Sequence, residues 1–346
     1  MTFSGQEDRV GILKKLEEDF MKTMNMKKTV LAGVMAGAAL YAFSFTAVPG
    51  NVQKMTRVQA EETAFTGSGE YNGILYENGE PFTGVKDRKY YVDGVFQSDA
   101  NGWEKVDGKR YYLKNGKARK KGFKKLKSYT GDKKKYKYYF NEDGSLSTNL
   151  FKDWGYNKCI KSKMTIEINT KTHNLTFYLY DKKSKKYIIP AKTVICSTSA
   201  KSNGTPRGHF FLMKTSAKRW VHVPNNTTRK YQWAVRIAGT PTLIHSSVYR
   251  QYGNNKSLIA DYYNTLGSSN TSYCVRLQAV NAKIVYDVAT KTNTKERVWV
   301  NIVKNNNKGP FGVVKLKDST GKLKSSRKTD PTDPALFPTN PFSVDE

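Results

Sequence analysis

Acidic residues, cysteines and histidines are all scarce in this chain of 346 residues. Asp and Glu number 29 against 59 Lys and Arg, which leaves a formal net charge of +30. A charge of that size favours binding to a polyanion. Only three cysteines and four histidines are present, and no Cys-x-x-Cys or His/Cys cluster has the spacing of metal ligands. The sequence therefore predicts no metal site.

The three cysteines are Cys159, Cys196 and Cys274. An odd number leaves at least one thiol free in an exported protein, where disulfides form. Cys159 and Cys196 could form a disulfide. Cys196 lies in the apolar segment 193–198, so a plain buried thiol is an equal alternative.

The N-terminal region has the pattern of an export sequence. Lys27 and Lys28 precede an uncharged apolar stretch over residues 29–48, and Val-Gln-Ala follows at 58–60. We expect residues 1–60 to contain a secretory signal, with an uncleaved membrane anchor as the alternative because about 20 apolar residues span a bilayer. Either places the rest of the protein outside the cell and in contact with the cell wall. That location excludes nucleic acid as the partner.

Paired aromatic residues followed by turns recur from residue 71 to about 151. The turns Asp93-Gly94, Asn115-Gly116 and Asp143-Gly144 favour two-residue hairpins, because type I′ turns need a positive φ. We expect a module of stacked β-hairpins over residues 61–155. Residues 102–112 resemble the GW-x4-G-x2-YY unit of cell-wall-binding (choline-binding-like) repeats. The aromatic residues expected to bind the wall are Tyr90, Tyr91, Trp103, Tyr111, Tyr112, Tyr138 and Tyr139.

A dense cationic run accompanies these hairpins. Residues 109–137 contain 14 Lys or Arg and one Asp. Such a run is often only a solvated face, but outside the cell it would hold anionic wall polymers by counterion release. We therefore expect anionic wall polymers as partners.

The pattern changes after residue 155. Residues 164–169 and 175–180 alternate apolar and polar side chains, which indicates a β-hairpin. Apolar residues recur at helical spacing over 277–288. We expect a mostly-β domain over residues 160–304 with a helix after Cys274. The Lys/Ser-rich and then Pro-rich residues 317–346 are expected to form a disordered tail.

Cys274 is the candidate nucleophile. We expect it to lie at the N-terminus of the following helix beside Arg276, where both would lower the pKa of its thiol. A cysteine nucleophile also needs a base. His245 ends an apolar strand and meets small residues, which suits a cleft. All four histidines precede Cys274, which excludes the papain-like order.

These residues resemble the catalytic region of L,D-transpeptidases. Residues 243–246 (LIHS) and 271–277 (TSYCVRL) are similar to the family's strand-ending His and its Ser/Thr-His-Gly-Cys-x-Arg/Asn segment. Residues 196–198 and 205–210 are similar to the STG and TPxGxF motifs, and the resemblance covers roughly residues 163–303. It implies a β-sandwich-like domain.

The resemblance also implies roles for individual residues. Cys274 would be the nucleophile, His245 the base, and the carbonyl of Ser246 would orient His245. Arg276 would hold the site together or contact substrate, and the amides of Tyr273 and Cys274 would form the oxyanion hole. The implied reaction is 3→3 cross-linking of peptidoglycan stem peptides through an acyl-enzyme, with no cofactor.

Two features depart from the family pattern. Tyr273 replaces a glycine, which predicts a narrower site or an altered backbone. The segment from Ser246 to Thr271 is longer than usual, and we expect its extra residues, 249–270, to form a lid over the cleft. Two alternatives remain open, which are a sortase-like cysteine transpeptidase and a non-catalytic wall-binding protein with a degenerate domain.

Overall fold

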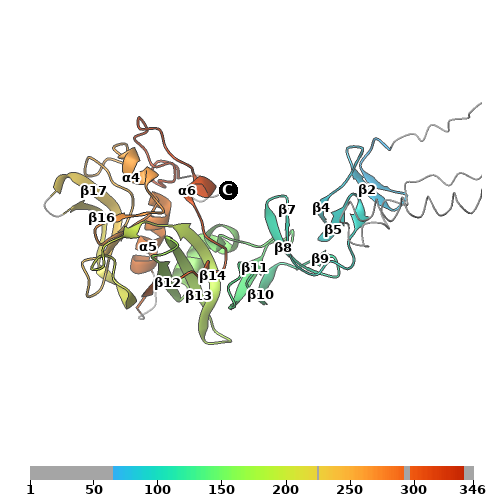
Figure 1. The fold of residues 1–346 in the computed structure, drawn as a ribbon, viewed down its shortest axis with the longest axis horizontal. Coiled ribbons are helices and arrows are strands. Elements are labelled where there is room, and N and C mark those ends of the chain that lie inside the picture. The colour runs from blue at the N-terminus through green and yellow to red at the C-terminus, as the bar shows by residue number, and fades with distance from the viewer. Residues whose placement is uncertain (1–64, 224–225, 292–296, 339–346) are drawn as a thin grey trace, which may run out of the picture. The chain divides into compact units, whose positions relative to one another are not determined.

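The computed structural model describes residues 65–223, 226–291 and 297–338 (Figure 1). They form two compact units, the first with residues 65–83 and 91–96, the second with residues 84–90 and the chain from 97 onward. The predicted signal or anchor in residues 1–60 lies outside the described residues. Among the described helices, none has the length and apolar character needed to cross a membrane.

The region before residue 141 consists of short β-strands. They are β1 (Gly69–Tyr71), β2 (Ile74–Glu77), β3 (Glu80–Pro81), β4 (Gly84–Lys86), β5 (Lys89–Val92), β6 (Val95–Phe96), β7 (Gly102–Val106), β8 (Lys109–Lys114), β9 (Lys117–Ala118), β10 (Gly122–Lys127) and β11 (Lys135–Phe140). They pair antiparallel, for example β7 with β8 and β10 with β11. The predicted β-hairpin region is confirmed.

The turn residues explain these hairpins. Asp93 and Gly94 have φ values of 48° and 75°, and Asn115 and Gly116 have 51° and 69°. Two successive positive φ values define the type I′ geometry that matches the strand twist. The third turn differs, because only Gly144 of its pair has a positive φ.

An aromatic cluster fills the hairpins of the second unit. The Trp103 ring lies 5.3 Å from Tyr112 and 5.2 Å from Tyr138, centroid to centroid. Ring pairs in such edge-on arrangements contribute about 0.5–1.5 kcal/mol each beyond their burial. Tyr111, Tyr138 and Tyr139 are buried. Burial leaves little of these rings for a wall ligand, because Tyr111 and Tyr138 pack inside the hairpins and Tyr139 packs in the core of the larger domain.

The second unit continues into a larger mostly-β domain. Its elements are η2 (Phe151–Gly155, a π-helical turn), α3 (Tyr156–Lys161), β12 (Met164–Asn169), β13 (Asn174–Asp181), β14 (Lys186–Ile195), β15 (Thr198–Ser199), β16 (Gly208–Val223), β17 (Asn226–Ile237), β18 (Leu243–His245), α4 (Ala260–Asn264), β19 (Ser269–Thr271), β20 (Val275–Arg276), α5 (Ala279–Lys291), β21 (Trp299–Val303) and α6 (Leu316–Ser319). The main sheet has the order β14-β13-β12-β21-β16-β17-β18-β20.

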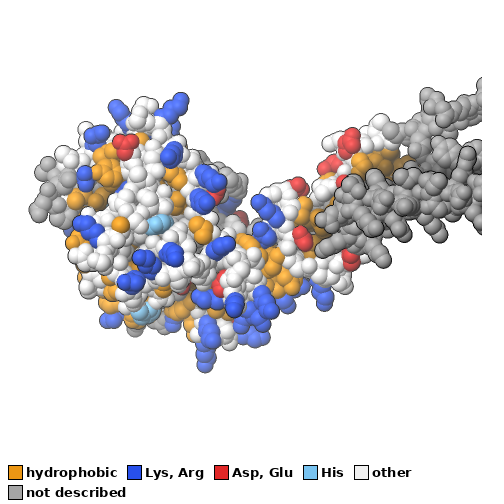
Figure 2. Space-filling model, viewed as in Figure 1, with side chains coloured by type: hydrophobic (Ala, Val, Ile, Leu, Met, Phe, Trp, Pro, Cys, Tyr) orange, Lys and Arg blue, Asp and Glu red, His pale blue; other side chains and the backbone are white. Residues whose placement is uncertain are grey.

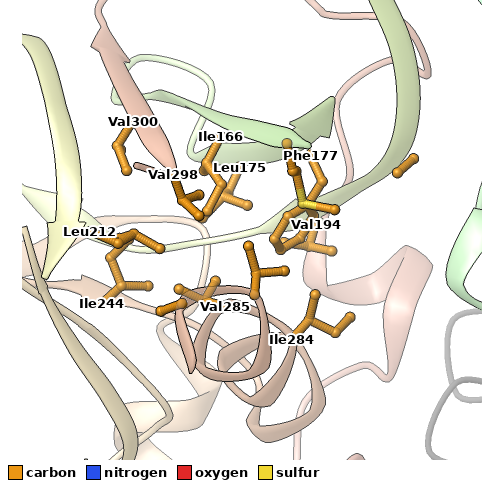
Figure 3. Packing of buried hydrophobic residues seen from close by; sticks show 14 of the residues in the cluster. Ile166, Leu175, Phe177, Val194, Leu212, Ile244, Ile284, Val285, Val298 and Val300 are labelled. Atoms are coloured by element: carbon orange, nitrogen blue, oxygen red, sulfur yellow. The ribbon is translucent and has the colours of Figure 1, made fainter. Parts of the chain in front are cut away.

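The long strand β16 joins the two halves of this sheet. Its first residues pair with β21 and its later residues pair with β17. The main core lies between the halves and α5, where Ile284 and Val285 meet Val194, Leu212 and other sheet residues (Figure 3). Burying each such side chain contributes about 1.5–3 kcal/mol. The predicted sandwich-like, mostly-β fold with a helix after Cys274 is confirmed.

The core of this domain begins before residue 160. Leu150 and Phe151 are fully buried in it, and the Phe151 ring lies 5.5 Å from that of Phe177. The hairpin module predicted for residues 61–155 therefore ends earlier than expected. Its last residues belong to the larger domain, because Phe151 of η2 packs on Phe177 of β13.

The predicted disordered tail is wrong for residues 317–338. Asp330, Thr332 and Asp333 are buried, and the Asp330 carboxylate accepts a hydrogen bond from the amide of Ala279 at 2.9 Å. Thr332 accepts one from the amide of Val280. The segment therefore caps the N-terminus of α5, where unpaired amides need acceptors. Residues 339–346 lie outside the described residues.

All three cysteines are free thiols. Cys159 and Cys196 are both buried in the main core, and burial raises the pKa of the Cys196 thiol well above its ordinary value. The buried-thiol alternative is the one that the structure shows. Cys274 is partly exposed.

Candidate active site

Two short parallel strands bring the candidate base and nucleophile together. β18 pairs with β20 so that His245 lies opposite Arg276. Cys274 immediately precedes β20, and its thiol is hydrogen-bonded to the backbone of Leu243. Neighbouring strands lie about 4.8 Å apart. Because directly paired residues share a face, His245 and Arg276 lie on the same face of this strand pair, and Cys274 is the residue directly before β20.

The His245 imidazole is held in one tautomer. Its Nδ1 lies 2.6 Å from the carbonyl oxygen of Ser246. A carbonyl can only accept, so Nδ1 carries the proton and Nε2 presents its lone pair. Nε2 is buried and has no hydrogen-bond partner among the described residues. Burial lowers the pKa of His245 to about 3, so the ring is neutral at physiological pH.

Ser246 is itself held firmly. Its hydroxyl donates to the carbonyl of Ser247 at 2.9 Å and accepts from the amide of Gln232 at 3.0 Å. Ser246 is fully buried. The carbonyl that orients His245 thus comes from a residue with a fixed backbone, which agrees with the role that the resemblance implied.

The environment of the Cys274 thiol differs from the prediction. Burial raises its pKa, while the hydrogen bond with the Leu243 backbone and the charges of Arg236 and Arg276 oppose the rise. The expected helix terminus is absent at this position, since α5 begins at Ala279 and a strand follows Cys274 directly. Helix-dipole effects fall off within the first turn. The Cys274 thiol and the His245 imidazole are therefore both uncharged at neutral pH.

Arg276 is a buried clamp. Its guanidinium donates to the carbonyl of Tyr262 at 2.7 Å, to Thr265 at 3.1 Å and to the carbonyl and side chain of Asn270. Its backbone also forms two hydrogen bonds with Ser197, each 2.9 Å long. These bonds tie the strand after Cys274 to the segment 249–270, and both expected roles of Arg276 stay predictions.

The segment 249–270 packs beside this clamp. Tyr249, Leu258, Tyr263 and Leu266 form a small buried cluster with residues of the C-terminal segment. The segment is therefore packed on the domain through an apolar cluster that it shares with Ile195, Trp220 and Leu316. Its proposed action as a lid stays a prediction.

Tyr273 does not distort the backbone beside the nucleophile. It is not among the described residues with a positive φ, and its side chain is 37% exposed. Its carbonyl accepts hydrogen bonds from the hydroxyls of Thr205 (2.9 Å) and Thr242 (3.2 Å). Within the described structure, no hydrogen bond is donated by the amides of Tyr273 or Cys274. Both amides thus lack an internal acceptor, which is one condition for the predicted oxyanion hole.

Tyr231 is a site residue that the sequence reasoning missed. Its ring stacks on the His245 imidazole, with centroids 3.6 Å apart and planes 13° apart. Burial raises the pKa of the Tyr231 hydroxyl to about 12, and the electrostatic effect of the nearby Cys274 acts in the same direction. Alternation along β17 points Tyr231 to one face, but no motif in the sequence marks it.

The remaining predicted wall-binding residues stay predictions. Tyr90, Tyr91, Trp103 and Tyr112 are partly exposed in the hairpins. The indole of Trp103 donates to the carbonyl of Lys127 at 3.0 Å, which fixes its orientation.

Comparison with known proteins assigns the larger domain to a class. Residues 163–302 match the model of the L,D-transpeptidase catalytic domain (YkuD). The second unit therefore contains a domain of the L,D-transpeptidase type, whose family acts on peptidoglycan stem peptides. No curated protein matches the chain.

Several solved structures are similar to this chain over part of its length. One is an L,D-transpeptidase in complex with imipenem, at 18% identity over 41% of this chain and 59% of that one, with a TM-score of 0.30. Another is from Mycobacterium smegmatis, at 14% identity over 41% and 58%, with a TM-score of 0.30. A third is from Mycobacterium tuberculosis H37Rv, at 15% identity over 41% and 58%, with a TM-score of 0.30. The chain spans less than two thirds of each of these structures.

Proposed function

We propose that this protein is an exported L,D-transpeptidase that forms 3→3 cross-links in peptidoglycan through a Cys274 acyl-enzyme. The observation that carries the proposal is the buried, unpartnered Nε2 of His245 on the strand beside Cys274. A buried polar atom without a partner is costly, and a function that uses its lone pair explains why it is retained.

The first step forms a thioester. His245 Nε2 takes the thiol proton as Cys274 Sγ attacks the carbonyl carbon after the third residue of a stem tetrapeptide. The amides of Tyr273 and Cys274 stabilise the oxyanion. The imidazolium then gives its proton to the departing amine, and the terminal D-residue leaves as the C–N bond breaks.

The second step transfers the acyl group. The side-chain amine of the diamino acid on a neighbouring stem attacks the thioester carbon and loses a proton to His245. The C–S bond breaks, the thiol is regenerated, and the new amide is the cross-link. A neutral thiol–imidazole pair suits this mechanism because the proton moves only as the new bond forms.

The proposed setting is the cell wall. The export pattern in residues 1–60 and the hairpin region support retention of the enzyme at its substrate, and tethering raises the local concentration of stem peptides. Anionic wall polymers are proposed as additional partners because of the net charge of +30.

The intact mass of the protein after exposure to imipenem tests the acyl-enzyme. A β-lactam carbonyl is an activated amide, so Cys274 is expected to open the ring and gain the mass of one imipenem. Cys274→Ala is expected to gain none, whereas Cys159→Ala, which removes a buried thiol of α3, keeps the adduct. An unmodified wild type would favour the non-catalytic alternative, and an adduct on Cys274→Ala would place the chemistry elsewhere.

Cross-linking itself is tested with a purified disaccharide-tetrapeptide. The expected products are free D-amino acid and a dimer joined between two third residues. Release of the D-residue without a dimer would identify a carboxypeptidase instead.

A further inference from the structure

A groove of about 780 Å³ lies between the β10–β11 hairpin and the sheet of the larger domain, both within the second unit. Its wall is basic, with five lysines and one carboxylate, that of Glu167. The lysines are Lys125, Lys134, Lys135, Lys163 and Lys186. Figure 2 shows Lys and Arg side chains gathered around β10, β11 and the hairpin that joins β13 and β14. The groove is separate from the Cys274 site, since no residue lines both.

The register of the hairpin places like charges opposite one another. Lys125 faces Lys137 and Lys127 faces Lys135 across β10 and β11. Directly opposed like charges destabilise a strand pair. Only Lys137 is compensated, by an ion pair with Asp181 at 2.7 Å, whereas Lys125, Lys127 and Lys135 form no salt bridge among the described residues. The hairpin thus carries unneutralised charge that a bound anion would offset.

The groove also contains aromatic and polar surface. His209 stacks on Trp299 with centroids 4.5 Å apart, and His209 is exposed. The rings of Tyr136 and Tyr178, which also line the groove, stack with their centroids 6.0 Å apart and are largely buried. Asn301 adds a hydrogen-bonding amide. Flat apolar surface with a few polar groups is suited to a ligand that has carbon–hydrogen and hydroxyl groups between its charges.

We propose that this groove binds a polyol-phosphate chain, a phosphodiester polymer of the cell wall. The ammonium groups would neutralise successive phosphates, while the aromatic and amide side chains contact the polyol units. The groove would then be the site at which the anionic polymer of the proposed function binds. That the polymer comes from the cell wall rests on the proposed function.

Binding of a short glycerol-phosphate oligomer to the full chain tests the site. The groove variant carries Lys125→Gln, Lys135→Gln and Lys186→Gln. The matched control carries Lys317→Gln, Lys322→Gln and Lys324→Gln, three exposed lysines outside the groove. Both lose the same charge. We expect the groove variant to bind roughly tenfold more weakly, with a shallower dependence of log K on log salt, and the control to change less than about twofold.

Equal losses in the two variants would show diffuse attraction and overturn the proposal. A single-stranded oligonucleotide with the same number of phosphates is the competitor for selectivity. If it displaces the oligomer with equal or higher affinity, the groove is a general polyanion site and the polyol assignment is wrong. We expect it to compete more weakly.

Purified cell walls test the source of the ligand. The wild type is expected to be retained on intact walls and released from walls stripped of anionic polymer, whereas retention on stripped walls overturns the assignment. Cys274→Ala is expected to bind the oligomer unchanged, and the groove variant to form the imipenem adduct. A wild type that binds the oligomer but forms no imipenem adduct would therefore reject the proposed function only. A wild type that forms the adduct but does not bind the oligomer would reject the proposed ligand of the groove only.

Discussion

At the residue scale, burial sets the protonation of His245, the base of the proposed mechanism. The carbonyl of Ser246 fixes the proton on Nδ1, and burial lowers the pKa of the ring to about 3. The stack with Tyr231 excludes solvent from one face of the imidazole. The His245 imidazole is therefore neutral over the whole physiological pH range, as the proposed general base must be.

The pH dependence of imipenem acylation follows from this pKa. A histidine with a lowered pKa is already neutral above about pH 4, so the second-order rate constant is expected to show no imidazole inflection between pH 5 and 8. It rises only where the Cys274 thiol, whose pKa is raised, begins to ionise. Stopped-flow or mass-spectrometric rates across this range give the measurement.

His245→Gln tests whether the imidazole is the base in imipenem acylation. Loss of a general base costs about 10²–10⁴-fold in rate. The control is His222→Gln, because His222 stacks on Tyr252 and has no part in the proposed mechanism. This variant should keep the wild-type rate. A wild-type midpoint near pH 6.5 would mean that the imidazole titrates normally and that the site is solvated.

At the element scale, the C-terminal segment holds the N-terminus of α5. The amide of Ala279 donates to Asp330, which is fully buried, and burial raises the pKa of that carboxyl to about 6. Gln232 also donates to Asp333 at 2.7 Å, which links the segment to β17. The segment thus joins the helix and the strand that carries Tyr231.

The buried Asp330 predicts a pH-dependent stability. Its folded pKa of about 6 exceeds the ordinary 3.8, so the folded protein binds the proton more tightly than the unfolded chain does. The stability contributed by this group is full below about pH 4 and is lost as the pH rises to about 6. Urea unfolding at several pH values should show this slope in the wild type and lose it in Asp330→Asn.

Asp318→Asn, at an exposed carboxylate of the same segment, is the control for the unfolding series. It should keep the wild-type slope. The same slope in Asp330→Asn would assign the effect to another group.

At the scale of the whole molecule, the catalytic domain extends beyond the matched residues 163–302. Phe151 lies before this range and Leu316 lies after it, yet both are buried against the domain. The hairpin β10–β11 also packs on it, since Lys137 pairs with Asp181 and Tyr136 stacks on Tyr178. Segments on both sides of the matched range thus pack on the domain.

Phe151→Ala tests this extended boundary. Removing a buried Phe costs about 3–5 kcal/mol through lost transfer energy and the cavity left behind. Thermal unfolding of the full chain should show a clearly lower Tm for the transition that also abolishes imipenem acylation. Phe96→Ala, in the first unit, should leave that transition unchanged. An unaltered Tm in Phe151→Ala would place the domain boundary after residue 155, as the sequence suggested.

The sequence by itself determined the features that depend on near neighbours. Strand alternation predicted the hairpin of β12 and β13, the pairs Asp93-Gly94 and Asn115-Gly116 predicted their turns, and the order of His245 before Cys274 pointed to the catalytic pair. These patterns are local, because side-chain period and turn conformation depend on a few adjacent residues.

Only the tertiary structure decided the features that depend on burial. The protonation of Cys274, the capping of α5 by Asp330 and the burial of Tyr138 all arise from segments far apart in the chain. The composition of residues 317–338 suggested disorder, yet a few polar side chains find partners on α5 and β17. Desolvation is a sum over everything that surrounds a group, and no short stretch of sequence contains that sum.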